Sequence, residues 1–465
     1  MAPERPVLHD ASRGWLSWGA LERESARAAG RLHGAGLRAG NRVLFSAASS
    51  AALVAAHVAC LRLGLVIVPA NPDYRSAELD RLVGAAAPRA AIVDDAARAG
   101  ALAAAGRLVT SPELPLPELP PPALDAVAPG APALLAYTSG TTGPPKGALL
   151  SHANLHATAE AVRLAWRWSP DDRLVHALPL FHMHGLGVAL HGTLQAGASA
   201  VLLPRFDPDV VLAAVTEHAA TLFFGVPTMI HRLAEHPGVG ALGRLRLVVS
   251  GSAPLAADLH ERFARATGHA ILERYGMTET GMLVSNPLAG ERRAGTVGLP
   301  LPGVEVRLAE PSGEIEVRGP NVFAGYLDRP DADALAFTAD GWFKTGDLGA
   351  LDSDGYLRIV GRAKELVITG GQNVHPRDVE EVLREHPDVR DAAVVGTPSA
   401  EWGELVTAYV VSPRELTLEE LRRHCAGRLA AYKHPRALHR VAELPRNALG
   451  KLERHRLREG RVLPE

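Results

Sequence analysis

Short apolar runs alternate with helical patterns along most of this chain, and the alternation limits what it can fold into. The run Arg42–Phe45 predicts a strand, Ser50–Leu63 a helix, and Gly64–Pro69 the next strand. Strands that alternate with helices form parallel sheets whose faces the helices cover. From Gly295 to Ile359 the pattern changes to short strands with turns. The predicted fold is α/β: a large N-terminal domain of parallel sheets with a small β-barrel-like subdomain, then a small mobile α+β C-terminal domain.

Composition argues against several kinds of partner. The 465 residues are 47% hydrophobic and carry a net charge of -2, which gives no electrostatic case for nucleic acid or an anionic membrane. Cys60 and Cys425, the two cysteines, do not suggest a disulfide framework. The N-terminus lacks the apolar core of a signal peptide, and the longest apolar stretch, Ala51–Ala70, contains His57 and Arg62. We expect a cytoplasmic protein without a nucleic-acid or membrane partner.

The segment Tyr137–Gly147 is dense in glycines, hydroxyls and prolines and carries one ammonium, at Lys146. An apolar run, Ala133–Ala136, precedes it, and a helical pattern begins at His152, so we expect the segment to join a strand to a helix. Backbone N–H groups and a cation in such a loop can hold a polyphosphate. The segment does not fit the Walker pattern, because Gly147 follows Lys146 where Ser or Thr would stand. A phosphate-binding loop of another kind is therefore predicted.

Lysine is scarce in this chain. Of the 49 lysines and arginines together, only five are lysines: Lys146, Lys344, Lys364, Lys433 and Lys451. The abundance of Arg and Ala suggests a GC-rich genome, whose codons disfavour Lys. A lysine retained against that bias is expected to supply a compact or titratable ammonium that a guanidinium cannot replace. The presence of any one arginine, by contrast, carries little information.

The segment Tyr137–Lys146 resembles the signature phosphate loop of the adenylate-forming enzymes, the superfamily of acyl-CoA synthetases, luciferases and peptide-synthetase adenylation domains. Further resemblances follow in the family's order at Gly251–Pro254, Tyr275–Glu279, Trp342–Gly349 and Pro445–Lys451. The resemblance implies an enzyme that joins a carboxylate to the α-phosphate of ATP with loss of pyrophosphate. Such a reaction needs phosphate-binding amides, Mg²⁺ and a cation at the reacting centre.

The resemblance also implies a nucleotide site. Tyr275 would stack on adenine, Thr278 would bind a phosphate oxygen, and Glu279 would be the single carboxylate that Mg²⁺ requires. Asp347, in a glycine-flanked turn, would accept the ribose hydroxyls, with Arg362 as the second ribose contact. The implied ATP and AMP contacts together are Thr138, Ser139, Gly140, Thr141, Thr142, Gly143, Lys146, Gly251, Ser252, Ala253, Tyr275, Gly276, Thr278, Asp347 and Arg362.

In the resembling enzymes the C-terminal domain carries the catalytic lysine. Residues 1–361 would form the adenylation domain, 362–364 the hinge, and 365–465 the C-terminal lid domain. Lys451 would bridge the substrate carboxylate and the α-phosphate. The implied catalytic residues are Lys451, Glu279, Thr138 and Lys146.

Coenzyme A is the implied second substrate. Rotation of the C-terminal domain about Lys364 would exchange the Lys451 loop for the segment Gly370–Gly371, which would line a channel for the CoA thiol. Acetylation of Lys451 would remove the bridging charge. A lysine acetyltransferase acting on Lys451 is therefore a predicted partner.

The acyl pocket determines which acid is used. The positions that line it in the resembling family include His182, Arg232 and Arg274 here, and Arg pairs carboxylates through two hydrogen bonds. The segments Leu247–Leu255 and Ile271–Thr280 resemble the malonyl-CoA synthetase branch. That resemblance implies that Arg232 and Arg274 contact malonate, while Met183 and Met277 face its α-carbon. Malonate is the predicted acid, and methylmalonate is expected to be accepted because Met is flexible.

Four alternatives remain open on the sequence. The chain could be an acyl-CoA synthetase for a short monocarboxylic acid, with its arginines solvated or paired structurally. It could be an adenylation domain that loads a carrier protein in place of CoA. An ATP hydrolase or kinase and a non-catalytic nucleotide-binding protein are rivals of other classes, which product analysis and acid-dependent pyrophosphate exchange would distinguish.

Overall fold

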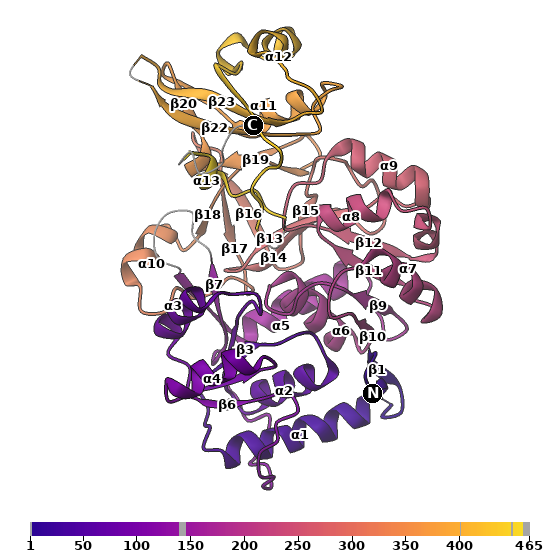
Figure 1. Ribbon diagram of the computed structural model, residues 1–465. Coiled ribbons are helices and arrows are strands. Elements are labelled where there is room, and N and C mark those ends of the chain that lie inside the picture. Colours follow the sequence, from indigo (N-terminus) through magenta and orange to yellow (C-terminus); the bar gives the residue numbers. More distant parts are fainter. Residues whose placement is uncertain (1, 139–145, 400, 448–449, 459–465) are drawn as a thin grey trace. The chain divides into compact units, whose positions relative to one another are not determined.

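The computed structural model describes residues 2–138, 146–399, 401–447 and 450–458. By their internal contacts these residues form two compact units. The first unit comprises Met1–Glu305 with Val317–Phe343, and the second comprises Val306–Glu316 with Lys344–Glu465. The predicted α/β class is confirmed, and the helices and strands can be followed in Figure 1.

Two large sheets organise the first unit. The order of the first is β6-β5-β3-β4-β7-β8, and the order of the second is β15-β14-β13-β12-β11-β9-β10-β1-β2. The described strands are β1 (Pro6–Asp10), β2 (Gly14–Ser17), β3 (Arg42–Ser46), β4 (Val66–Pro69), β5 (Ala90–Val93), β6 (Leu108–Thr110), β7 (Pro132–Thr138), β8 (Lys146–Ser151), β9 (Arg173–His176), β10 (Ser199–Leu202), β11 (Leu222–Gly225), β12 (Leu247–Ser250), β13 (Leu272–Met277), β14 (Gly281–Ser285) and β15 (Leu299–Pro300). Their inner pairs are parallel and the pairs at β2, β8, β14 and β15 are antiparallel.

Helices cover these sheets because the inner strands are apolar on both faces. Every residue of β11 and β12 is buried, which is typical of parallel strands covered on both sides. One core cluster joins Phe223 and Val248 to Val211, Ile230 and Phe263 of the helices α7, α8 and α9, which lie along one side of the sheet (Figure 1). The helices are α1 (Trp18–Gly34), α2 (Ala51–Arg62), α3 (Ser76–Ala86), α4 (Ala96–Ala104), α5 (His152–Ala165), α6 (His191–Ala196), α7 (Pro208–Glu217), α8 (Pro227–Ala234), α9 (Ala257–Thr267) and α10 (Pro330–Ala336).

The second unit contains the short strands and the small C-terminal domain that the sequence predicts. One sheet has the order β16-β17-β18-β19, and another has the order β21-β20-β23-β22 with β24 beside β23. Its elements are β16 (Glu305–Ala309), β17 (Glu314–Arg318), β18 (Phe343–Leu351), β19 (Leu357–Arg362), β20 (Val367–Thr369), β21 (Gln372–Val374), α11 (Pro376–Arg384), β22 (Asp391–Ser399), β23 (Gly403–Val411), α12 (Leu418–Cys425), β24 (Ala437–Arg440) and α13 (Arg454–Arg458). Helices α11 and α12 pack their apolar sides on this second sheet.

The contacts divide the chain earlier than the predicted boundary at residue 361. Strand β18 and its antiparallel partner β19 belong almost entirely to the second compact unit. The predicted hinge at 362–364 therefore lies inside that unit, and its role as a hinge stays a prediction.

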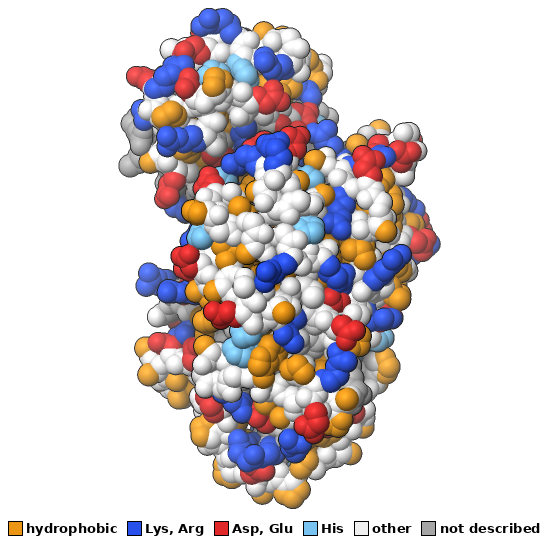
Figure 2. Space-filling model, turned by 90° about the vertical axis from the view of Figure 1, so that its right-hand side faces the viewer, with side chains coloured by type: hydrophobic (Ala, Val, Ile, Leu, Met, Phe, Trp, Pro, Cys, Tyr) orange, Lys and Arg blue, Asp and Glu red, His pale blue; other side chains and the backbone are white. Residues whose placement is uncertain are grey.

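On the face drawn in Figure 2, basic and acidic side chains are interspersed. No helix formed by the described residues combines the length and the apolar character needed to cross a bilayer.

A buried histidine pair joins α2 to α6 in the first unit. The Nε2 atoms of His57 and His191 are 2.8 Å apart, so one ring donates a hydrogen to the other. Burial, with a smaller contribution from His191, lowers the pKa of His57 well below its ordinary value, and burial lowers the pKa of His191 to about 4. Both rings are therefore neutral in the native protein at pH 7.

The unfolding temperature should fall steeply as the pH is lowered from 7 to 5. In that range the unfolded chain binds protons at these histidines that the folded protein does not, so the free energy of unfolding falls with pH. Each such histidine lowers the free energy of unfolding by roughly 2 kcal/mol as the pH falls from 6.5 to 5. Scanning calorimetry of the wild-type protein and of H57Q, which lacks one of the two titrating rings, should give a shallower pH dependence for H57Q. Equal slopes would contradict the account.

Candidate active site

The predicted phosphate loop joins two strands. Strands β7 and β8 pair in antiparallel fashion, with Thr138 opposite Lys146, and α5 begins only after β8, where Ser151 caps it. The expected strand-to-helix connection is therefore wrong, since apolar residues on both sides of the loop form a hairpin. This geometry also removes the P-loop alternative, which requires a helix directly after the lysine. The predicted contacts Ser139, Gly140, Thr141, Thr142 and Gly143 lie outside the described residues.

The structure brings Lys146 close to Glu279 through a tyrosine. The Lys146 Nζ atom lies 4.9 Å from the ring centroid of Tyr326, and the Tyr326 hydroxyl donates to Oε1 of Glu279 over 2.9 Å. Burial and the Glu279 carboxylate raise the pKa of Tyr326, so its hydroxyl remains a donor. Sequence reasoning missed Tyr326, since neither its spacing nor its neighbours mark it. These three side chains form a candidate site for phosphate oxygens and their counter-ion.

Glu279 fits a magnesium ion that phosphate oxygens and water also coordinate. It is only 5% exposed, at the turn after β13. The described residues contain no group of three or more His, Cys, Asp or Glu side chains arranged to hold a metal. Mg²⁺ commonly binds one or two carboxylates together with substrate phosphates. The donor set therefore suits a magnesium ion that arrives with a nucleotide.

The segment Tyr275–Thr278 leads from β13 into the antiparallel strand β14. A side chain on Gly276 would meet the carbonyl oxygen of Gly281 at 2.1 Å, so the hairpin requires glycine there. Thr278 lines a pocket together with Tyr137, His182 and Met183. The end of the phosphate-loop strand, the predicted acyl loop and a predicted phosphate contact thus surround one pocket.

The predicted adenine turn lies against an arginine. Gly251 follows β12, and a Cβ atom on it would lie 2.6 Å from Nε of Arg274, so only glycine allows this approach. Ser252 adopts a left-handed backbone with φ of 73°. Its hydroxyl lies 3.3 Å from Nδ1 of His184. Ala253 is half-buried beside them.

Arg274 is a buried cation for which the part of the chain that the structure describes supplies no paired carboxylate. The residue is 5% exposed, and its Nε and Nη2 atoms are buried without a hydrogen-bond partner among the described residues. Burial lowers the pKa of Arg274 to about 9, which still leaves the guanidinium charged at pH 7. A buried charge without a partner destabilises a protein by several kcal/mol. Such an arrangement is typical of a site that an anionic ligand completes.

A neutral histidine, His184, lies near this guanidinium. Burial, followed by Arg274, His176 and His182, lowers the pKa of His184 well below its ordinary value. Burial also lowers the pKa of His182 to about 4. His184 begins a π-helical segment, His184–Leu190, a conformation often found at functional sites. Sequence reasoning named His182 and missed His184, although the repeat His-Met-His was a visible signal.

Arg232 differs from Arg274 in its exposure to solvent. Arg232 is exposed on α8, where its guanidinium carbon lies 5.1 Å from the ring centroid of Phe206. Met277 is half-buried at the end of β13, opposite Gly281. The expectation that both arginines contact one acid therefore stays a prediction.

The two predicted ribose residues form a pair within the second unit. Asp347 of β18 lies directly opposite Arg362 of β19, and the Arg362 Nε atom is 2.7 Å from Oδ1 of Asp347. Asp347 is buried, and Gly346 before it has φ of 73°. Antiparallel pairing explains why residues 15 positions apart can serve one ligand.

The remaining predicted residues are also in the second unit. Lys364 is exposed in a short 3-10 segment, Ala363–Glu365. Gly370 and Gly371 have φ of 55° and 74° and form the turn between β20 and β21. Lys451 is exposed and its backbone N–H donates to Asn447 Oδ1 over 3.0 Å.

Family models match most of the chain. A model described as AMP-binding enzyme matches residues 1–327, and one described as AMP-binding enzyme C-terminal domain matches residues 378–451.

Curated relatives act on different acids. A feruloyl-CoA synthase from an Amycolatopsis species is 38% identical over 94% of this chain and 92% of that protein. A sulfoacetate–CoA ligase from Cupriavidus necator is 38% identical over 98% of this chain and 94% of its own length. The mitochondrial malonate–CoA ligase of Mus musculus is 40% identical over 70% of this chain and 64% of that protein.

Solved structures share the whole fold. The crystal structure of ATP-bound MatB from Rhodopseudomonas palustris has a TM-score of 0.93 at 39% identity, covering 98% of this chain and 96% of that one. A malonyl-CoA ligase with methylmalonyl-CoA and AMP bound has a TM-score of 0.71 at 42% identity, covering 96% of this chain and 98% of that one. The relatives agree on acid–CoA ligation and differ in the acid.

Proposed function

Because this chain belongs to the AMP-binding enzyme family and is an adenylate-forming acid–CoA ligase, we propose that its acid is malonate, with methylmalonate also accepted. The carboxylate attacks the α-phosphate of ATP and pyrophosphate leaves. The CoA thiol then attacks the acyl carbon, which gives malonyl-CoA or methylmalonyl-CoA and AMP.

The observation that carries the choice of acid is the buried guanidinium of Arg274, whose Nε and Nη2 atoms have no hydrogen-bond partner among the described residues. Malonate has a second carboxylate that can pair with it after the first has reacted. A monocarboxylic acid such as ferulate or butyrate would leave the charge unpaired and buried, at a cost of several kcal/mol. Sulfoacetate carries a sulfonate that could also pair with Arg274, so it is the second candidate acid.

The phosphates and ribose of ATP and the reacting centre each have candidate residues on this chain. Lys146, beside Tyr326, binds the leaving phosphates, with Thr138 and Thr278 as further contacts. Mg²⁺ held by Glu279 would neutralise phosphate charge. Asp347 and Arg362 hold the ribose. Lys451 supplies the cation at the reacting centre, where one positioned charge stabilises the transition state most strongly.

Room for a methyl branch would come from the methionines. Met183 lines the pocket. Its Sδ atom packs directly against Gly187, since a Cβ atom on that glycine would lie 2.0 Å from it. A thioether chain with several rotatable bonds can move aside for one methyl group. The preference for malonate over methylmalonate should therefore be modest, within about tenfold in kcat/KM.

Incubation with ATP, Mg²⁺, malonate and free CoA tests the proposal against a carrier-protein role. We expect malonyl-CoA and AMP without any added protein, detected by mass spectrometry. Formation of malonyl adenylate without a CoA thioester would support loading of a carrier protein and contradict the CoA step.

A further inference from the structure

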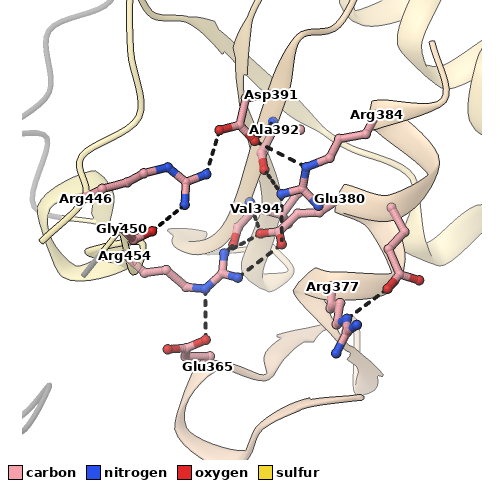
Figure 3. Close-up of polar contacts among 11 residues, drawn as sticks. Glu365, Arg377, Glu380, Arg384, Asp391, Ala392, Val394, Arg446, Gly450 and Arg454 are labelled. Atoms are coloured by element: carbon pink, nitrogen blue, oxygen red, sulfur yellow. Dashed lines mark hydrogen bonds and ion pairs between the residues drawn. The ribbon is translucent and has the colours of Figure 1, made fainter. Parts of the chain in front are cut away.

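Two arginines hold the ends of the loop that carries Lys451. Arg446 precedes Lys451 by five positions and Arg454 follows it by three. Both reach acceptors in other elements of the second unit (Figure 3). We propose that Arg446 and Arg454 are positioning residues that place Lys451 for adenylate formation. This inference rests on the proposed role of Lys451.

Arg446 connects the loop to the start of β22. Its Nη2 atom donates to Oδ2 of Asp391 over 2.6 Å, and its Nη1 atom donates to the carbonyl oxygen of Gly450 over 2.8 Å. Arg384 of α11 holds the other oxygen of Asp391, since its Nε atom is 3.2 Å from Oδ1. The residue directly before Lys451 is thus tied through one guanidinium to an anchored carboxylate.

Arg454 anchors the opposite end of the loop from inside the unit. Its Nε atom donates to Oε2 of Glu365 over 2.8 Å, and Nη1 donates to the carbonyl oxygen of Val394 over 3.0 Å. Nη1 and Nη2 also bind the two carboxylate oxygens of Glu380, which is 4% exposed in its side chain. One guanidinium therefore connects the short segment after the predicted hinge, α11, β22 and the loop.

The charges at this anchor favour the paired state. Burial alone would raise the pKa of Glu380, but Arg454 and Arg384 hold it below its ordinary value. The Glu380 Oε1 atom also accepts the backbone N–H of Val394 over 2.7 Å. A lysine could not replace Arg454, since a single ammonium cannot reach acceptors spread over three elements with the planar geometry of a guanidinium.

Hydrogen bonds inside the loop connect the backbone of Lys451 to these anchored ends. The Lys451 N–H donates to Asn447 Oδ1, and the Asn447 N–H donates to the Lys451 carbonyl over 2.9 Å. The Gly450 N–H donates to the Asn447 carbonyl over 2.8 Å. The backbone from which the exposed ammonium extends is therefore fixed relative to β22 and α11, although the side chain itself is not buried.

Such fixing matters for one half-reaction only. Misplacing a catalytic group by about 1 Å can cost about 10²-fold in rate. Lys451 is proposed to act in adenylation and not in thioester formation. A merely structural arginine would lower both half-reactions together, whereas a positioning arginine lowers the first alone.

The test measures both half-reactions in R446M, R454K and the matched control R456M, with the acid that the wild-type protein turns over fastest. Arg456 is an exposed arginine of α13, the helix that begins at Arg454, and it pairs with Glu453 three positions before it. We expect acid-dependent pyrophosphate exchange to fall roughly 10- to 100-fold in R446M and R454K. Thioester formation from preformed acyl adenylate should stay within about twofold, with R456M unchanged in both assays.

A second comparison keeps the inference falsifiable if R454K folds poorly. In a K451Q background, R446M should cause no further loss of pyrophosphate exchange, because both act through one ammonium. Equal losses in both half-reactions, an added loss in K451Q, or unchanged exchange in R446M would each overturn the inference. Failure of the proposed function would show differently, as a wild-type protein that forms no adenylate with any acid.

Discussion

Replacing Arg274 by methionine should lower kcat/KM for malonate by about 10²- to 10³-fold and leave kcat/KM for butyrate within about threefold. The guanidinium is buried beside Gly251 and has nitrogens that no described residue binds. Removing it leaves the distal carboxylate of malonate in an apolar site without a partner. Butyrate has no second charge to lose.

The same substitution should not weaken the fold in the absence of substrate. Methionine removes an uncompensated buried charge and fills a similar volume, so the unfolding temperature of R274M should equal or exceed that of the wild type. Arg265→Met on the exposed side of α9 is the matched control. A malonate-to-butyrate ratio that R274M leaves unchanged would contradict the dicarboxylate assignment.

The second predicted arginine can be tested in the same assay. Arg232 is exposed on α8 and lies over Phe206. A loss of malonate selectivity in R232M comparable to that in R274M would support its predicted contact with the acid. An unchanged ratio would leave Arg274 as the sole determinant of the two.

Replacing Lys451 by glutamine should reduce acid-dependent pyrophosphate release by about 10²- to 10³-fold, the usual cost of removing one preorganised charge from a reacting centre. Glutamine lacks the positive charge, as acetyl-lysine does, so enzymatic acetylation of Lys451 should have the same effect. Thioester formation from preformed malonyl adenylate should remain within about threefold of the wild type, since that step does not need a bridge to the α-phosphate.

The assignment of Lys451 to the first half-reaction can fail clearly. Arg456→Gln, at an exposed position of α13, controls for the loss of one positive charge in this region. Equal losses of both half-reactions in K451Q would show that Lys451 does not act specifically in adenylation.

The helices and strands formed by residues close in sequence could be predicted, because the local pattern of side chains determines them. The strands predicted at Arg42–Phe45 and Gly64–Pro69 and the strand before Thr138 follow from composition over about four to eight residues. The strand after Lys146 was missed because a run of Gly, Ala and Leu suits either a helix or a buried strand. Pairing with β7 decides between them.

Contacts between distant segments could not be predicted from one sequence. Tyr326 reaches Glu279 from 47 positions away, and Arg454 reaches Glu380 from 74 positions away. In a chain rich in arginine, nothing in the sequence separates the buried Arg274 and the half-buried Arg454 from exposed arginines such as Arg265. Burial and partners, which only the fold supplies, distinguish them.

The most direct measurement is a panel of acids scored by pyrophosphate release, with and without CoA. The panel contains malonate, methylmalonate, sulfoacetate, butyrate and ferulate at equal concentration with ATP and Mg²⁺. The account predicts the fastest release with malonate, then methylmalonate, and formation of the matching CoA thioesters. Faster release with ferulate or butyrate than with malonate would contradict it.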